Sequence, residues 1–196
     1  MIRAVDLGKR YGDYVFRHVN VELPERGLVA LVGPNGSGKT TLLKIFAMLT
    51  EPTEGEVYIM GTPWREARAR HRGDVLYSHQ EPLVYSGTVE DNLVCNDGDV
   101  VDALGLRPLL RHKAKSLSGG YKKLVTVARV LACRPKAALL DEPTAYLDPE
   151  KRRRLLDYVT QYAKKALVVW TTHYPPEAEN SDAMYEMRDG ALRRVR

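Results

Sequence analysis

The sequence predicts an α/β fold in which helices cover a mainly parallel β-sheet, with an antiparallel β subdomain at the N-terminus. Two observations predict this fold class. Apolar runs typical of buried strands alternate along the chain with segments that have the apolar spacing of amphipathic helices. Strands that are apolar on both faces belong to parallel sheets, because helices cover both faces there. Residues 2–23 instead alternate apolar and polar side chains, as antiparallel strands with one solvent-facing side do.

Length and composition fit one domain with a sizeable core. The chain has 196 residues, of which 44% are hydrophobic and 28% are charged. No apolar run approaches the roughly 20 residues that cross a bilayer. We expect no signal peptide, because no long apolar segment follows the first charged residue. The net charge of +5 comes from dispersed Lys and Arg without interleaved aromatic residues, so a nucleic-acid partner is not expected.

The two cysteines, Cys95 and Cys133, do not have the spacing of metal ligands. We expect both to be reduced core residues, because two isolated cysteines in such a chain fit a cytoplasmic protein. Neither is expected to take part in catalysis.

The elements of the first half follow from apolar runs and from the breaks between them. A turn at 24–27 contains proline and glycine and separates the antiparallel strands from the first buried strand, and a similar break lies at 51–55. The elements expected in this half are strand 28–32, a helix from 38 to about 50, strand 56–60, helix 64–70 and strand 74–77.

Residues 80–116 differ in character from the rest of the chain. They show little strand signal and two short helical patterns, at 89–95 and 100–106, and so predict a small helical insert. We therefore expect a single domain over 1–196, in which 1–79 and 117–196 form the core.

The core resumes after the insert with a well-patterned helix, in which Leu124, Val127 and Leu131 share one apolar face. Asp148 is the expected N-cap of a later helix, because Pro149 fits a first helical turn. The remaining expected elements are strand 137–141, a helix from 149, strands 167–171 and 183–187, and a hairpin turn at 189–190.

A glycine-rich loop between strand 28–32 and the helix after it fits the pattern Gly-x-x-x-x-Gly-Lys-Thr. Its residues are Gly33, Pro34, Asn35, Gly36, Ser37, Gly38, Lys39, Thr40 and Thr41. Glycines let backbone N–H groups point inward, and the helix N-terminus adds its positive dipole end, so the loop suits phosphates. We expect Lys39 to reach the β- and γ-phosphates of ATP and Thr40 to ligate Mg²⁺. The alternative, a glycine turn with a chance lysine, is disfavoured by the flanking strand and helix.

Polar side chains follow three predicted strands at the sheet edge where parallel α/β proteins bind ligands. Asp141 is expected to hold Mg²⁺, and Glu142 to orient and deprotonate the attacking water. His173 would donate to the γ-phosphate, and the Gln80 amide would contact Mg²⁺ or the water. Each of these residues has a plain alternative as a polar loop residue or a helix-end acid. Their order behind the phosphate loop favours a catalytic set made of these residues and Lys39.

A second anion-binding turn is expected at Ser118, Gly119 and Gly120, where a helix begins. Because one phosphate loop already satisfies the phosphates of one ATP, this turn suggests a γ-phosphate held by another subunit. Tyr11 precedes Gly12 and either stacks on adenine or packs as an ordinary tyrosine.

Taken in this order, the motifs resemble those of the ATP-binding-cassette (ABC) ATPases, the nucleotide-binding subunits of ABC transporters. The resemblance covers about residues 3–195. It implies that 33–41 is the Walker A loop, Gln80 the Q-loop glutamine, 118–120 the signature turn, Asp141 and Glu142 the Walker B pair, Asp148 the D-loop aspartate, His173 the switch histidine and Tyr11 the adenine-stacking residue.

In this family two subunits sandwich two ATP molecules head to tail, so the resemblance implies that 118–120 contacts ATP held by a second ABC ATPase subunit. Asp148 is also expected among the nucleotide-binding residues. It also implies a cytoplasmic ATPase, peripheral on the inner face of the membrane, that drives a separately encoded permease through contacts near 81–93. Three tyrosines depart from the family's pattern and bear on how the subunits pair: Tyr121 in the signature, Tyr146 in the D-loop and Tyr174 after the switch histidine.

Two other functions compete with the transporter ATPase. A soluble ABC-type ATPase, for example in iron–sulfur cluster assembly, has the same motifs; the DNA- and ribosome-acting relatives carry a long coiled coil or two cassettes, and neither is present in this sequence. A small-molecule kinase explains 33–41 but does not explain 118–120 together with His173. The motif set therefore favours the ATP-hydrolysing subunit of an ABC transporter.

Overall fold

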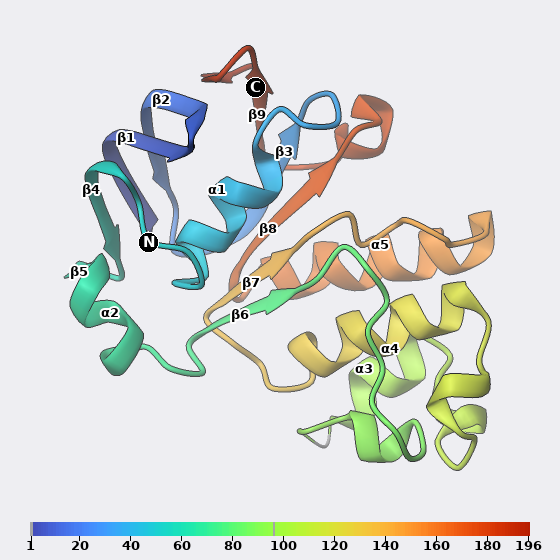
Figure 1. Ribbon diagram of the computed structural model, residues 1–196. Helices are drawn as coiled ribbons and strands as arrows, with labels where there is room; N and C mark the ends of the chain where they lie inside the picture. The colour runs from blue at the N-terminus through green and yellow to red at the C-terminus, as the bar shows by residue number, and fades with distance from the viewer. Residues whose placement is uncertain (1, 96) are drawn as a thin grey trace.

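The computed structural model describes residues 2–95 and 97–196, and its centre is a six-stranded sheet (Figure 1). The strand order is β10-β9-β3-β8-β7-β6; the pairs from β9 to β6 are parallel, and β10 is antiparallel to β9. The strands are β3 Gly27–Val32, β6 Val75–Ser78, β7 Ala137–Leu140, β8 Leu167–Thr172, β9 Ala183–Arg188 and β10 Ala191–Arg194. The predicted α/β class with a mainly parallel sheet is thus confirmed.

A second, four-stranded antiparallel sheet with the order β2-β1-β4-β5 confirms the expected N-terminal β subdomain. Its strands are β1 Ile2–Tyr11, β2 Asp13–Leu23, β4 Glu54–Ile59 and β5 Thr62–Pro63, and helix α2 Trp64–Arg70 follows β5. The alternation of apolar and polar residues along β2 places Val19, Val21 and Leu23 in the core, while Glu22 faces solvent.

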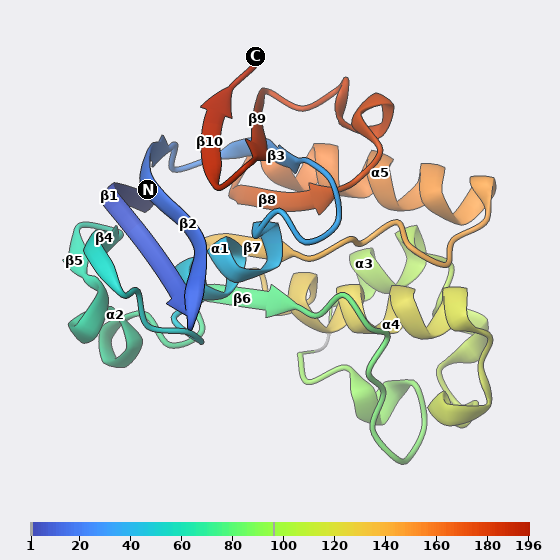
Figure 2. The ribbon, with the colours of Figure 1, turned by 45° about the horizontal axis from the view of Figure 1, so that its top comes forward.

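The two faces of the central sheet pack against different layers (Figure 2). Val29 and Leu31 of β3 share a core with helix α1 Lys39–Phe46, which lies between the two sheets. The alternate residue Ala30 faces the other way, into a core formed with α3 Gly98–Ala103, α4 Gly119–Leu131 and α5 Pro149–Ala163. None of the helices in the described part of the chain combines the length and apolar character that crossing a membrane requires.

Local caps explain where several elements begin and end. Asp148 accepts a hydrogen bond from the backbone N–H of Lys151 at 2.9 Å, which confirms it as the N-cap of α5. Helix α1 ends at Phe46 rather than near residue 50, because Met48 takes a left-handed φ of 58°. Asp189 and Gly190 both have positive φ, as the predicted hairpin turn between β9 and β10 requires.

The insert at 80–116 contains α3 and the short 3₁₀ helices Glu90–Asn92, Arg107–Leu109 and Ala114–Ser116; a fourth, Pro175–Ala178, follows β8. The helix expected at 89–95 is reduced to the first of these turns. The reason is that the Asn92 side chain bonds the backbone of Tyr85 and Thr88, which gives this segment an alternative to helical hydrogen bonds. The ranges 1–79 and 80–116 also include Met1 and Asn96, which lie outside the described residues.

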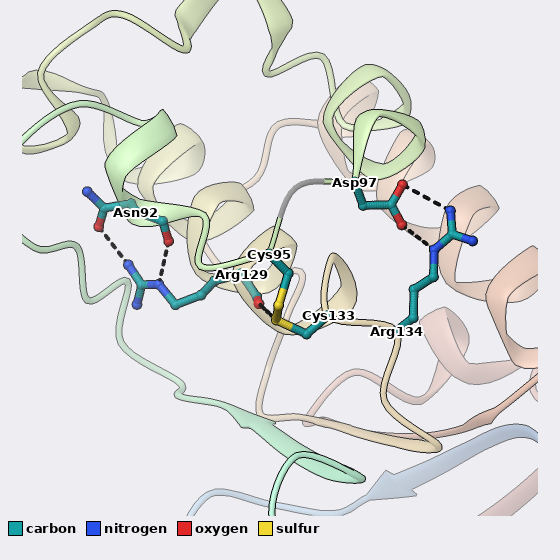
Figure 3. The surroundings of a disulfide bond; sticks show 6 residues. All are labelled: Asn92, Cys95, Asp97, Arg129, Cys133 and Arg134. Carbon is teal, nitrogen blue, oxygen red and sulfur yellow. Dashed lines mark hydrogen bonds and ion pairs between the residues drawn. A yellow bond between two sulfur atoms is a disulfide. The ribbon is translucent and has the colours of Figure 1, made fainter.

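Cys95 and Cys133 form a disulfide, so the expectation of two reduced core residues was wrong (Figure 3). Their Cα atoms are 5.0 Å apart, and both residues are half-buried rather than in the core. Cys133 follows α4 and Cys95 lies in the insert, so the bond depends on how the insert packs against α4, which cysteine spacing does not reveal. An ion pair between Arg134 Nε and Asp97 Oδ2, at 2.6 Å, also joins the insert to the segment that follows α4.

Removal of this disulfide is expected to destabilise the chain. Because the bond closes a loop between residues 38 apart, Cys95→Ser should lower the free energy of unfolding by about 3 to 4 kcal/mol through the gain in unfolded-state entropy. Urea unfolding with and without a reductant checks this. The wild type should lose stability on reduction and the variant should not; equal sensitivity of the two proteins to reductant would contradict the pairing.

Candidate functional site

The loop 33–41 joins β3 to α1 at the edge of the central sheet where its parallel strands end (Figure 1). It opens onto a cavity of about 360 Å³, whose lining includes Asn35, Lys39 and Thr40. Gln80 and Glu142, from the loops after β6 and β7, line the same cavity. The structure therefore brings the predicted phosphate loop and two of the predicted catalytic residues to one place.

Glycine is required at two positions of the loop. Gly33 has a φ of 149°, and a Cβ there would lie 2.2 Å from the Met187 carbonyl oxygen. Gly38 has a φ of 102°, and a Cβ there would lie 2.9 Å from Val15 Cγ1. The loop can therefore wrap closely around the N-terminus of α1 only with these glycines, which leaves the cradle open for a phosphate.

Lys39 is the cation of this loop. Its side chain is nearly buried, with the residue 6% exposed, and its ammonium donates to the carbonyl oxygens of Gly33 at 2.8 Å and Pro34 at 2.9 Å. Burial lowers the pKa of Lys39, and the charges of Glu142 and Asp141 offset part of that shift. The ammonium thus lies inside the phosphate cradle, held by two main-chain oxygens for which phosphate oxygens can substitute.

Asp141 is fully buried where β7 ends, and three hydroxyl groups satisfy its carboxylate. Oδ1 accepts hydrogen bonds from Thr171 Oγ1 at 2.7 Å and from Thr40 Oγ1 at 3.1 Å. Oδ2 accepts a hydrogen bond from the Tyr77 hydroxyl at 2.8 Å. Burial, together with the Asp141 charge, raises the pKa of Tyr77, so this hydroxyl remains a donor. Asp141 and Thr40 are therefore adjacent, as a shared metal site requires.

Glu142 links the other catalytic candidates. Its Oε2 accepts a hydrogen bond from Gln80 Nε2 at 3.3 Å, and its Oε1 lies 3.5 Å from His173 Nδ1. Its backbone has a left-handed φ of 43°, and its N–H donates to Thr171 Oγ1 at 2.8 Å. Thr171 thus fixes the backbone after Asp141 while it bonds the Asp141 carboxylate.

Other predicted residues lie away from the cavity. Ser118 and Gly119 are exposed at the N-terminus of α4, beside the N-terminus of α5 and its cap Asp148, and Figures 1 and 2 both separate these helix ends from the phosphate loop. Tyr11 is 63% exposed, outside the lining of the cavity, with the Lys9 ammonium 4.6 Å from its ring centroid.

The three tyrosines that depart from the family pattern lie around the ends of α4 and α5 and the loop after β8. Exposed Tyr146 and Tyr174 line a cavity of about 260 Å³ together with Glu142 and His173. The Lys151 ammonium lies 4.5 Å from the Tyr121 ring centroid and also pairs with Asp148. Tyr121, Tyr146 and Tyr174 therefore add aromatic side chains to the surface near the signature turn.

Sequence reasoning missed Tyr77, Thr171 and Lys123 as parts of this site. Tyr77 and Thr171 lie near the ends of predicted strands at the ligand edge, so their positions were available as a signal. Lys123 shares the apolar helix face of Val127 and Val130, and a lysine at that spacing signals a buried charge.

The donor set fits Mg²⁺ and a triphosphate. Thr40, Asp141 and Gln80 offer hydroxyl, carboxylate and amide oxygens, the hard ligands that Mg²⁺ prefers. Among the described residues, no cluster of three or more His, Cys, Asp or Glu side chains could hold a metal alone. Mg²⁺ is usually shared between one or two carboxylates and substrate phosphates, and Asp141 is hydrogen-bonded to Thr40 of the phosphate loop.

A glycine cradle at a helix N-terminus, faced by a buried carboxylate across the ends of parallel strands, defines a P-loop nucleoside triphosphatase. Comparison with known proteins identifies the family of P-loop nucleoside triphosphatases to which the chain belongs. A family model described as "ABC transporter" matches residues 16–145, and the chain belongs to that family.

Several known proteins are similar in sequence to this chain over nearly its whole length. The lipoprotein-releasing system ATP-binding protein LolD of Rickettsia bellii is 30% identical over 97% of this chain and 96% of its own length. The cobalt import ATP-binding protein CbiO of Syntrophus aciditrophicus is 31% identical over 98% of this chain and 76% of its own. The dimeric ATP-binding cassette MJ0796, solved in a post-hydrolysis state with ADP and Pi, is 26% identical, with a TM-score of 0.90 over 100% of this chain and 99% of that one. The chain is therefore an ATP-binding ABC transporter ATPase.

Proposed function

We propose that this chain powers a separately encoded membrane permease through ATP-dependent closure of a dimer of cassettes. The observation that carries the proposal is the division of the motifs between two places. The phosphate loop lines one cavity with Gln80 and Glu142, whereas the turn 118–120 and Asp148 lie at the ends of α4 and α5, away from it. A second chain placed head to tail would supply the missing turn to each site.

In the proposed mechanism the phosphates of ATP lie in the loop 33–41. Lys39 exchanges its bonds to the Gly33 and Pro34 carbonyls for bonds to phosphate oxygens. Thr40, Asp141 and Gln80 would hold Mg²⁺, which neutralises phosphate charge when bound.

The hydrolytic step uses Glu142 and its two neighbours. Glu142 orients the attacking water and takes its proton, while Gln80 holds one oxygen of the Glu142 carboxylate. His173 lies on the other side of that carboxylate and donates to the γ-phosphate. The turn 118–120 of the second subunit would bind the same phosphate with its backbone N–H groups.

The permease contact is proposed at 81–93, which begins directly after Gln80. Leu83 and Tyr85 in this segment expose large apolar surfaces, as a protein-binding segment does. A contact there would reach the nucleotide site through Gln80, and it would hold the chain at the inner face of the membrane. In this proposal 80–116 is the helical insert and 1–79 with 117–196 the nucleotide-binding core.

A mixing experiment tests the shared site. Glu142→Gln and Ser118→Arg should each abolish hydrolysis. At a given site, residue 142 comes from the subunit that holds ATP, and residue 118 comes from the subunit that closes over it. Ser118 makes no side-chain cap bond, so its replacement should not unfold α4. Mixed in equal amounts before ATP is added, the two variants should regain up to about a quarter of the wild-type rate, because half of the dimers then carry one intact site.

Ser116→Arg, which adds the same side chain outside the turn, is the matched control and should hydrolyse ATP alone. A mixture no faster than the two inactive variants would contradict the shared site. Co-purification with a polytopic membrane protein would separate the transporter subunit from a soluble ABC-type ATPase.

A further inference from the structure

Lys123 is a fully buried lysine in the second turn of α4, with 0% of the residue exposed. Its ammonium donates to three main-chain oxygens: Gln80 at 2.7 Å, His79 at 2.9 Å and Asp141 at 3.0 Å. A lysine ammonium has three donors, and all three are used here. Burial lowers the pKa of Lys123 to about 8, and the charges of Asp141 and Glu142 offset part of that shift.

The three acceptors belong to two different loops of the nucleotide site. His79 and Gln80 follow β6, and Asp141 follows β7 and precedes Glu142. The hydrogen bond between the Gln80 amide and the Glu142 carboxylate is long, at 3.3 Å, so its geometry depends on where the two backbones are held. Lys123 bonds the backbone of Gln80 itself and of the residue before Glu142.

Lys123 also sits only three residues beyond Gly120 of the signature turn, on the same helix. Further along α4, Arg129 donates to the Asn92 carbonyl at 2.9 Å and to the Leu83 carbonyl at 3.1 Å. Helix α4 therefore begins at the signature turn, contacts the loops of the nucleotide site through its second turn and contacts the segment 81–93 through its third.

We propose that Lys123 is a positioning residue for hydrolysis, which joins the signature helix to the backbones of Gln80 and Asp141 so that Gln80, Glu142 and the turn 118–120 keep fixed relative places. This inference rests on the proposed function, because it assigns Lys123 a part in that reaction. Each of the three acceptors is a main-chain oxygen of a loop that carries Gln80 or Glu142, so the ammonium fixes where these two loops lie relative to α4.

The test compares Lys123→Met, Lys123→Gln and the control Lys122→Met. Methionine keeps most of the length and removes all three donors, whereas a glutamine amide keeps two. Lys122 is the adjacent, partly exposed lysine. The control variant removes its ammonium and leaves the buried contacts of Lys123 intact. Lys123→Met should reduce kcat at least about tenfold and change the KM for Mg·ATP less than about threefold, because the reacting groups lose alignment while the phosphate cradle remains. Lys123→Gln should give an intermediate kcat, and Lys122→Met the wild-type kcat.

Amide hydrogen exchange supplies a readout that global destabilisation would not reproduce. Exchange over residues 77–83 should accelerate in Lys123→Met, while β3 and the loop 33–41 exchange as in the wild type. A wild-type kcat in Lys123→Met would overturn the inference, and so would a lost kcat with unchanged exchange over 77–83. If Lys123→Met does not fold, Lys123→Gln decides: a wild-type kcat in that variant overturns the inference. A wild-type chain that hydrolyses no ATP would instead contradict the proposed function.

Discussion

Glu142→Gln is expected to bind ATP normally and to hydrolyse it about 100- to 10,000-fold more slowly than the wild type. Glutamine keeps the size of the side chain beside Gln80 and His173, but its amide cannot take a proton from the attacking water. Because the bound triphosphate then persists, the variant should also remain in the closed dimer that ATP induces.

Phosphate release in a single turnover measures the first effect, and the molar mass from light scattering with Mg·ATP measures the second. Glu66→Gln on α2, whose exposed carboxylate pairs with Arg70 rather than with the cavity, is the control and should behave as the wild type. A Glu142→Gln chain that stays monomeric with bound ATP would refute the sandwich mechanism for this protein.

Lys39→Ala is expected to weaken ATP binding by about 100-fold or more, because a buried, charge-assisted contact to phosphate is lost. The ammonium already lies within the cradle, bonded to the Gly33 and Pro34 carbonyls, so its removal takes a buried positive charge away from the phosphate site. Titration of each protein with ATP in a calorimeter checks this. Lys44→Ala, on the same helix but outside the cavity lining, should bind as the wild type. Unchanged affinity in Lys39→Ala would refute the Walker A assignment.

The parts of the site predicted from sequence are those that local chemistry determines. Gly33 and Gly38 of the loop 33–41 have positive φ, and this local backbone requirement makes glycine visible as a signal in the sequence. Gln80, Glu142 and His173 could be placed together without coordinates, because the carboxyl ends of parallel strands share one sheet edge.

The parts that sequence did not reveal depend on packing between distant segments. In the sequence, Tyr77 and Thr171 look like ordinary strand residues. Their hydroxyls reach Asp141 because of the register of β6, β7 and β8, which the sequence does not show. The Cys95–Cys133 disulfide likewise requires the insert to lie against α4. The strand-end positions of Tyr77 and Thr171 were a signal in the sequence, but neither their shared partner Asp141 nor the disulfide pairing can be deduced from spacing along the chain.

The most direct measurement is a structure of Glu142→Gln with Mg·ATP bound, because it tests whether each chain forms only part of its nucleotide sites. We expect two ATP molecules between two chains, each with its triphosphate in the loop 33–41 of one chain and against the turn 118–120 of the other. A structure in which that turn lies far from every triphosphate would contradict this account.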